Sequence, residues 1–164
     1  MCGIVGYIGD RDITSVLIVG LERLSYRGYD SSGIAILSDN ELSVWKKSGK
    51  ISELSKVISC LNIKSKIGIG HTRWATHGIA NDINAHPHLS PSKKMAVVHN
   101  GIIENYQDIK NKLIKFGFLF RSDTDSEVIS HLIEYYYKSD FRLAVKKAIS
   151  DLVGSFSIAV ISEY

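Results

Sequence analysis

Residues 1–10 read MCGIVGYIGD, and this stretch decides the kind of fold that the rest of the chain is expected to complete. Glycine alternates here with β-branched and aromatic residues, which predicts a buried strand over residues 2–8. Cys2 begins that strand, and a methionine that stands before a small residue, as Met1 does before Cys2, is the kind that cells remove. Removal of Met1 would leave Cys2 first in the chain, with a free α-amine beside its own thiol.

An amine next to a thiol is a self-contained nucleophile. A free α-amine has a pKa of about 8 and a cysteine thiol has a pKa of about 8.5, so the amine can accept the thiol proton without a histidine. The alternative interpretation of Cys2 is a chance cysteine, inert in a buried first strand. The choice between the two depends on the rest of the sequence.

Apolar periodicity predicts an α+β domain. We expect helices over residues 13–24, 51–61, 105–116, 125–138 and 141–152, and strands over residues 33–38, 42–47, 66–71, 95–99 and 156–162. A turn over residues 38–40 makes a hairpin of two of these strands, and Thr124 with Glu127 predicts a capping box. Residues 27–33 and 72–94 are expected to be loops, and a loop as long as the second is usually functional or disordered.

Composition excludes several classes of protein. The chain has 164 residues, 45% of them hydrophobic, enough for one packed core, and its net charge is only +3. Consecutive basic residues occur only in pairs, so the sequence lacks the basic cluster that is typical of nucleic-acid-binding proteins. The first stretch is too short for a membrane span and lacks the layout of a signal peptide, so we expect a cytoplasmic protein. Cys60 is interpreted as a packing residue of the helix over residues 51–61.

Three further positions supply what acyl transfer from a free amino acid needs. Asn100 and Gly101 follow the strand over residues 95–99 and offer an amide donor and close backbone approach to an oxyanion, although Asn-Gly is also an ordinary turn. Arg73 stands in an uncharged context and suits an α-carboxylate. Asp125 suits an α-ammonium, although a first-turn helix acid is the common alternative.

Neither a metal nor a cofactor is expected. The histidine pairs at 71 and 77 and at 86 and 88 have no recognised zinc spacing, and no Cys or Glu cluster completes them. Glycines at positions 3, 6 and 9 recur every third residue, which is not a phosphate-binding or dinucleotide spacing.

Six ordered blocks carry a family resemblance. They are MCGIVG (1–6), YRGYDS (26–31), GHTRWATHG (70–78), NAHPH (84–88), HNGIIEN (99–105) and SDTDSE (122–127). Over all 164 residues the chain resembles the glutaminase domains of the glutamine–fructose-6-phosphate aminotransferases, which are class II glutamine amidotransferases. Other amidotransferases share the Cys-Gly-Ile start, whereas the RWATHG and NAHPH blocks are similar to the aminosugar enzymes.

This resemblance implies the N-terminal-nucleophile hydrolase fold, a four-layer αββα sandwich of two antiparallel sheets. It implies that Cys2 attacks the side-chain amide of L-glutamine, with its α-amine as base, and that Asn100 and the Gly101 N–H form the oxyanion hole. The other roles that it implies are Arg73 for the glutamine carboxylate, Asp125 for the ammonium, Thr76 and His77 as pocket lining, Arg27 near the nucleophile and Trp74 on a loop covering the substrate.

The resemblance also implies partners. The family's full enzyme carries a sugar-isomerase half that binds fructose 6-phosphate, and a homodimer of that enzyme is one expected assembly. Residues 1–164 are therefore expected to be an incomplete glutaminase domain, truncated at its C-terminus, with the isomerase domains absent. The alternative is an inactive remnant or a split-gene fragment that needs a partner.

Overall fold

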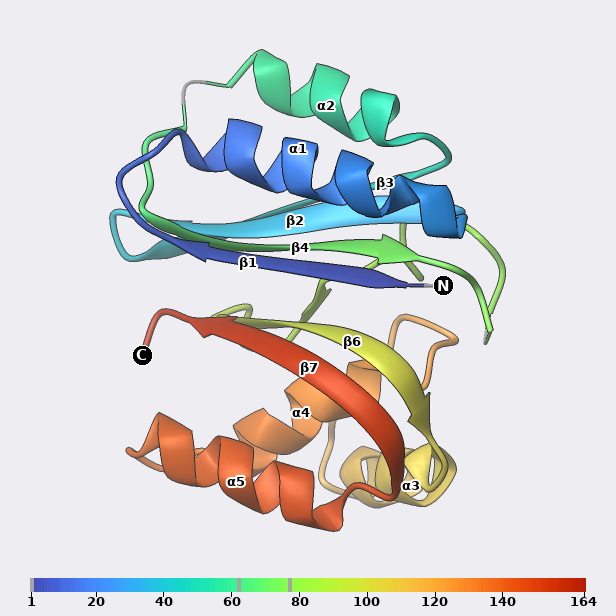
Figure 1. The fold of residues 1–164 in the computed structure, drawn as a ribbon. Helices are drawn as coiled ribbons and strands as arrows, with labels where there is room; N and C mark the ends of the chain where they lie inside the picture. Colours follow the sequence, from blue (N-terminus) through green and yellow to red (C-terminus); the bar gives the residue numbers. More distant parts are fainter. Residues whose placement is uncertain (1, 62, 77) are drawn as a thin grey trace.

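The computed structural model describes residues 2–61, 63–76 and 78–164, which form two facing antiparallel sheets with helices outside each (Figure 1). The first sheet has the order β1 (Gly3–Ile8), β4 (Ile67–Arg73), β2 (Ser31–Ser38) and β3 (Glu41–Ser48), and the second has the order β5 (His88–Leu89), β6 (Met95–Ile103) and β7 (Gly154–Ser162). Helices α1 (Ile13–Leu24) and α2 (Ile51–Ser59) cover the first sheet, and α3 (Tyr106–Lys115), α4 (Glu127–Tyr136) and α5 (Phe141–Asp151) cover the second. The predicted α+β class and αββα layering are confirmed.

Side chains alternate between the two faces of each strand, so the two sheets contribute to three apolar cores, one between the sheets and one under each helix layer. In β6, Met95 and Val97 pack against the α3–α5 layer, while Ala96 and Val98 face the other sheet. Strand β2 repeats the pattern: Ile34 and Ile36 pack under α1 and α2, and Ala35 between them points into the layer between the sheets. Both strands are therefore buried on two faces, which explains why they read as continuous apolar runs in the sequence.

The predicted hairpin is confirmed in detail. Ser38 pairs with Glu41, so only two residues connect β2 to β3. Asp39 and Asn40 both have positive φ, 50° and 64°. Two left-handed residues make a turn of type I′, whose twist matches the strands that it joins.

The structure corrects several local predictions. The strand over residues 95–99 continues as β6 to Ile103, so Asn100 and Gly101 lie inside it and pair with β7 instead of forming a turn. Strand β2 begins at Ser31 and β4 ends at Arg73, because these residues pair with each other and extend both strands into the expected loops. The capping box is wrong: Ser126 precedes α4 with no side-chain cap, and the Glu127 carboxylate instead accepts the backbone N–H groups of Arg121 and Ser122. The interpretation of Cys60 as a packing residue of a helix is also wrong, because Cys60 follows the last residue of α2 and is exposed.

Within the described ranges, none of the helices has the length and apolar character that crossing a membrane requires.

Candidate active site

Strand register places Cys2 beside the end of β4. Gly3 lies opposite Thr72 in the antiparallel pair of β1 and β4, so Cys2 comes next to Arg73 and Trp74. The Trp74 backbone N–H donates to the Cys2 Sγ over 3.3 Å. The sulfur therefore sits at the junction between a strand end and the loop that follows it.

Asn100 connects this junction to the second sheet. Its Nδ2 donates to the Cys2 carbonyl oxygen over 3.3 Å, and its Oδ1 lies 2.8 Å from the Nε2 of His71. His71 is 0% exposed, and burial lowers its pKa to about 4. A neutral His71 with its proton on Nε2 donates to Oδ1, which keeps the amide NH₂ of Asn100 turned toward Cys2.

Position 101, the next in the chain, requires glycine because of its backbone conformation. Its φ is +123°, and a Cβ there would lie 2.1 Å from the carbonyl oxygen of Ser155 on β7. Only glycine permits this conformation and this close approach of two strands.

Arg73 is held at the end of β4 by the loop that follows. Arg73 is 3% exposed. Its guanidinium donates to the carbonyl oxygen of Gly78, over 3.2 Å, and to that of Ile79. The Asp30 Oδ1 lies 3.9 Å from Arg73 Nη1, and the other oxygen of Asp30 accepts the Ala75 N–H. Asp30 thus anchors the backbone on the far side of Arg73 and balances part of its charge.

Asp125 is tied to the same strand that carries Asn100. It is buried, and its Oδ2 accepts the Ile103 N–H over 2.8 Å. The Ser126 hydroxyl donates to its Oδ1 over 3.3 Å and lies 2.8 Å from Nδ1 of His99. Burial lowers the pKa of His99, with Asp125 opposing that shift.

One pocket gathers most of the predicted site. Its lining includes six of the predicted residues: Cys2, Arg73, Trp74, Thr76, Gly101 and Asp125. The pocket encloses about 20 Å³, the room that about one water molecule needs. Four lining residues were not predicted, namely His86, His99, Thr124 and Ser126. Each lies inside one of the sequence blocks that carry the resemblance, which was the available signal.

Two predicted residues of the described chain are not in the lining of this pocket: Asn100, whose side chain nevertheless contacts Cys2, and Arg27. Arg27 is outside its lining and donates from Nε to the Tyr26 hydroxyl over 3.2 Å. His77 lies outside the described residues.

Buried histidines form the floor between the sheets. The ring of His86 lies 4.2 Å from that of His71 and 4.6 Å from that of His88, centroid to centroid. Burial is the first cause that holds the pKa values of His86 and His88 well below the usual range, and Arg73 adds to it. These rings are therefore neutral at pH 7. Among the described residues, no three His, Cys, Asp or Glu side chains are arranged to hold a metal ion.

The sequence model of the family described as "Glutamine amidotransferase domain" matches residues 58–164. The chain belongs to this glutamine amidotransferase domain family. The domain is also 55% identical, over 163 residues, to the glutamine–fructose-6-phosphate aminotransferase [isomerizing] of Aquifex aeolicus, covering 99% of this chain and 27% of that protein. The enzyme of the same name from Clostridium perfringens is 50% identical over 161 residues, covering 98% and 26%.

This glutamine amidotransferase domain thus spans about a quarter of the length of the curated relatives that it matches. Among solved structures it resembles the glutamine phosphoribosylpyrophosphate amidotransferase of B. subtilis, with a TM-score of 0.85 and 27% identity over 99% of this chain and 35% of that one. An allosteric regulatory enzyme of purine biosynthesis matches with a TM-score of 0.86 and 28% identity, covering 99% and 36%. The predicted fold of the N-terminal-nucleophile hydrolases is confirmed.

Proposed function

We propose that this domain hydrolyses the side-chain amide of L-glutamine to glutamate and ammonia, with Cys2 as nucleophile after removal of Met1. The observation that carries the proposal is the arrangement around one pocket: a thiol, an amide donor oriented by His71, and the oppositely charged Arg73 and Asp125. A free amino acid carries one carboxylate and one ammonium, so this charge pair suits it.

The first half of the reaction forms a thioester. The α-amine of Cys2 takes the thiol proton, and the thiolate attacks the amide carbon of glutamine. Asn100 donates one amide hydrogen to the Cys2 carbonyl oxygen. Its second amide hydrogen and the Gly101 N–H are then the donors to the oxyanion. The α-ammonium then gives its proton to the leaving nitrogen, the carbon–nitrogen bond breaks, and ammonia departs.

The second half restores the enzyme. Water gives a proton to the α-amine and attacks the thioester carbon at the same oxyanion site. Collapse of the second tetrahedral intermediate breaks the carbon–sulfur bond, releases glutamate and returns the proton to sulfur. Neither half consumes a cofactor.

Glutamine entry requires the pocket to open. A volume of about 20 Å³ is too small for an amino acid. Trp74 and Thr76 line the pocket on the loop after β4, and Trp74 is 52% exposed, so its side chain can move outward without leaving a core. We assign this loop the covering role and Arg73 and Asp125 the two charged ends of the substrate.

We further infer where the ammonia goes. The relatives are named glutamine–fructose-6-phosphate aminotransferases, so the ammonia is proposed to serve amino-sugar formation from fructose 6-phosphate in a sugar-isomerase half. Residues 1–164 are then the glutaminase part of a larger cytoplasmic enzyme, for which a homodimer is the assembly to test.

The test combines intact mass with glutamate release. We expect the chain to lack the mass of Met1, to take one adduct from the glutamine analogue 6-diazo-5-oxo-norleucine, and to release glutamate from glutamine. Cys2→Ala should lose both the adduct and the activity, whereas Cys60→Ala, which removes the exposed thiol after α2, should keep both. Glutamate release that survives in Cys2→Ala would refute the mechanism.

A further inference from the structure

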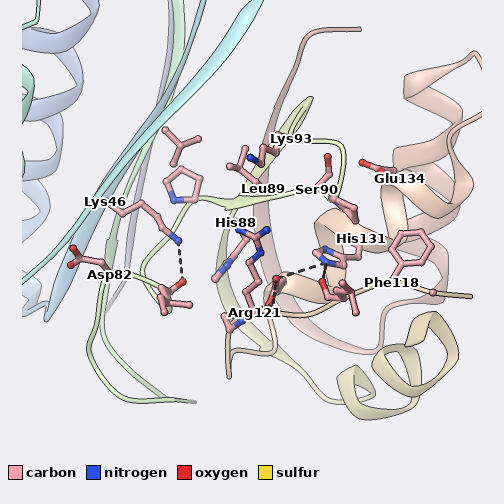
Figure 2. Close-up of a pocket in the computed structure, with 18 of the residues that line it drawn as sticks. Lys46, Asp82, His88, Leu89, Ser90, Lys93, Phe118, Arg121, His131 and Glu134 are labelled. Atoms are coloured by element: carbon pink, nitrogen blue, oxygen red, sulfur yellow. Dashed lines mark hydrogen bonds and ion pairs between the residues drawn. The ribbon is translucent and has the colours of Figure 1, made fainter. Parts of the chain in front are cut away.

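A large cavity in the described residues lies away from Cys2. It has a volume of about 610 Å³ and opens between β3, the segment around β5, residues 116–122 and α4 (Figure 2). Pockets of roughly 300–1,000 Å³ are the usual size for small-molecule sites. The proposed glutaminase reaction makes no use of this space.

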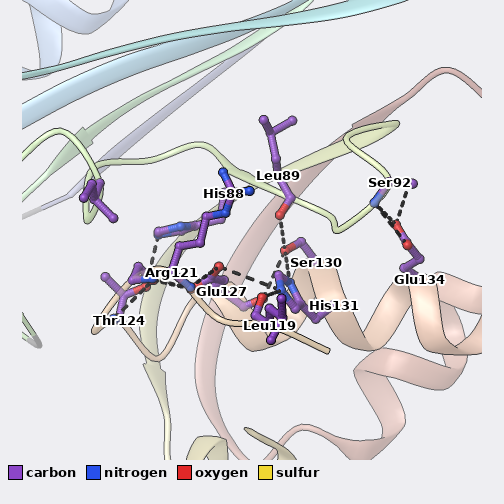
Figure 3. A network of polar contacts seen from close by, with 12 residues as sticks. His88, Leu89, Ser92, Leu119, Arg121, Thr124, Glu127, Ser130, His131 and Glu134 are labelled. Carbon is purple, nitrogen blue, oxygen red and sulfur yellow. Dashed lines mark hydrogen bonds and ion pairs between the residues drawn. The ribbon is translucent and has the colours of Figure 1, made fainter. Parts of the chain in front are cut away.

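A thin wall separates the cavity from the pocket around Cys2. His88 lines the cavity and Thr124 lines the pocket, and the Nε2 of His88 lies 3.1 Å from the Thr124 hydroxyl (Figure 3). The two sites are neighbours without sharing their charged side chains, since Arg73 and Asp125 belong to the pocket alone.

The carboxylates that line the cavity are already paired. Glu127 accepts the backbone N–H groups of Arg121, over 3.1 Å, and Ser122, over 2.7 Å, as well as the Ser122 hydroxyl. Glu134 accepts the N–H and hydroxyl of Ser92, and Asp82 accepts the Ser48 N–H and the Lys47 ammonium. These donors stabilise the carboxylates in their ionised form, and Lys47 balances the charge of Asp82.

The cations of the lining are less well paired. Lys46 donates to the carbonyl oxygen of Ile83 over 3.0 Å, and burial lowers its pKa to about 8, although Glu127 and Asp82 oppose that shift. Within the described part of the chain, the side chains of Arg121 and Lys93 make neither an ion pair nor a hydrogen bond. Lys46 is half-buried, and a half-buried cation without an ion-pair partner favours an anion from solution; Arg121 and Lys93 are exposed and add positive charge at the mouth of the cavity.

Apolar side chains form the opposite part of the lining. Phe116 and Leu119 are 59% and 83% exposed, unusual fractions for side chains of this size, and Phe118 lies beside them. Exposed apolar groups that gather at a cavity mark a site that a ligand with an apolar part can cover.

We propose that this cavity binds a small amphipathic anion, with its phosphate or carboxylate head at Lys46 and Arg121 and its apolar body against Phe116, Phe118 and Leu119. Figure 2 shows Lys46 and Arg121 reaching the cavity from different walls, and Phe118 at its far side. An arginine fork and a lysine point charge together suit an oxyanion, and the apolar wall accounts for the rest of the volume.

Phenyl phosphate is the probe, because it joins both parts of the proposed ligand. By calorimetric titration we expect saturable binding to the chain with a Kd of roughly 1 mM, as befits so small a molecule. Phenol and inorganic phosphate each keep only one part and should bind at least about tenfold more weakly. Benzoate tests whether a carboxylate head serves as well as a phosphate.

Variants locate the binding. Arg121→Gln and Lys46→Met should each weaken phenyl phosphate binding by about tenfold or more, the loss expected for one charge-assisted contact. Lys147→Met removes one charge from the exposed face of α5 and should leave the Kd unchanged. Among the described residues Arg121 has no side-chain partner to lose, so its variant tests the proposal even where Lys46→Met folds poorly.

Three results would overturn the proposal: no saturable binding of phenyl phosphate, equal binding by all three variants, or equal binding of inorganic phosphate. None of them bears on glutamine hydrolysis, which is measured separately through Cys2. Competition by glutamine would likewise count against it, since that would place the probe at Arg73 instead of Arg121.

Discussion

Acid should destabilise this domain through His71, and the size of the effect follows from its burial. The pKa of His71 is about 4 in the folded chain against an ordinary value of 6.5, with burial as the main cause. Between these values the unfolded chain binds the proton and the folded chain does not, so stability is full above pH 6.5 and falls as the pH drops toward 4. At about 1.4 kcal/mol per unit of pKa, the loss is about 3 kcal/mol in total, most of it reached by pH 4.5. No screening by solvent reduces this figure, because the ring is fully buried.

The perturbation is His71→Gln, which keeps a donor for Asn100 and removes the titration. Urea unfolding from pH 4.5 to 7.5 should give a free energy that falls less steeply with acid in the variant than in the parent, by about 1 kcal/mol per pH unit between pH 4.5 and 6. His86, His88 and His99 remain in both proteins, and burial, the first cause of their lowered pKa values, is present in both. His71 adds to that lowering for His86 and His88, so the difference measures His71 together with its effect on these two neighbours. Parallel curves for the two proteins, or a parent that gains stability in acid, would refute the argument.

Three further predictions concern single positions. Asn100→Ala should lower the kcat of glutamate release by about 10²–10³, with a smaller change in KM, because it removes an oxyanion donor; steady-state kinetics measures both. Gly101→Ala should give insoluble protein or a much lower Tm, because its Cβ would lie 2.1 Å from the Ser155 carbonyl oxygen, whereas Gly49→Ala, with nothing within 4 Å of its Cβ, should show only the smaller cost of a positive φ. Leu132→Ala should cost about 2–5 kcal/mol of unfolding free energy in urea, because this fully buried side chain of α4 leaves a cavity in the core.

Most elements of the fold could be predicted from periodicity, and the exceptions share a cause. The helix over residues 13–24 and the hairpin through Asp39 and Asn40 depend on local patterns, and both match the structure. Ser31 and Ser32 were expected in a loop because Gly28 and Gly33 flank them, yet they pair with the end of β4. Pairing with a strand some 40 residues away overrides local turn signals, and no local pattern reveals it.

Glu127 shows the same limit for a side chain. Its spacing from Thr124 is that of a capping box, and the expected bond is local. In the structure its carboxylate instead accepts the backbone N–H groups of Arg121 and Ser122, two residues of the segment that precedes α4. The sequence holds the acceptor and the donors, but the path of the chain between Phe118 and Ser126 decides which of them meet.

The candidate site was predicted as a set of residue types, and the structure adds what orients them. Cys2, Arg73, Gly101 and Asp125 line one pocket, as the blocks of sequence suggested. The sequence did not predict the role of His71, because nothing in its spacing distinguishes a histidine that orients an amide from one that packs in a core. Its identification needs the 2.8 Å contact with Asn100, which joins positions 29 residues apart.

Small residues between the sheets make that contact possible. His71 lies on β4 of one sheet and Asn100 on β6 of the other, so their hydrogen bond crosses the layer that separates the sheets. The core of this layer includes Ala35 and Ala96, each of which sits between larger residues that face the helices instead. Bulkier side chains at these positions would hold β4 and β6 farther apart, and a 2.8 Å hydrogen bond does not survive a separation of even about 1 Å. The apolar layer that closes the sandwich therefore also sets the distance on which the proposed oxyanion hole depends.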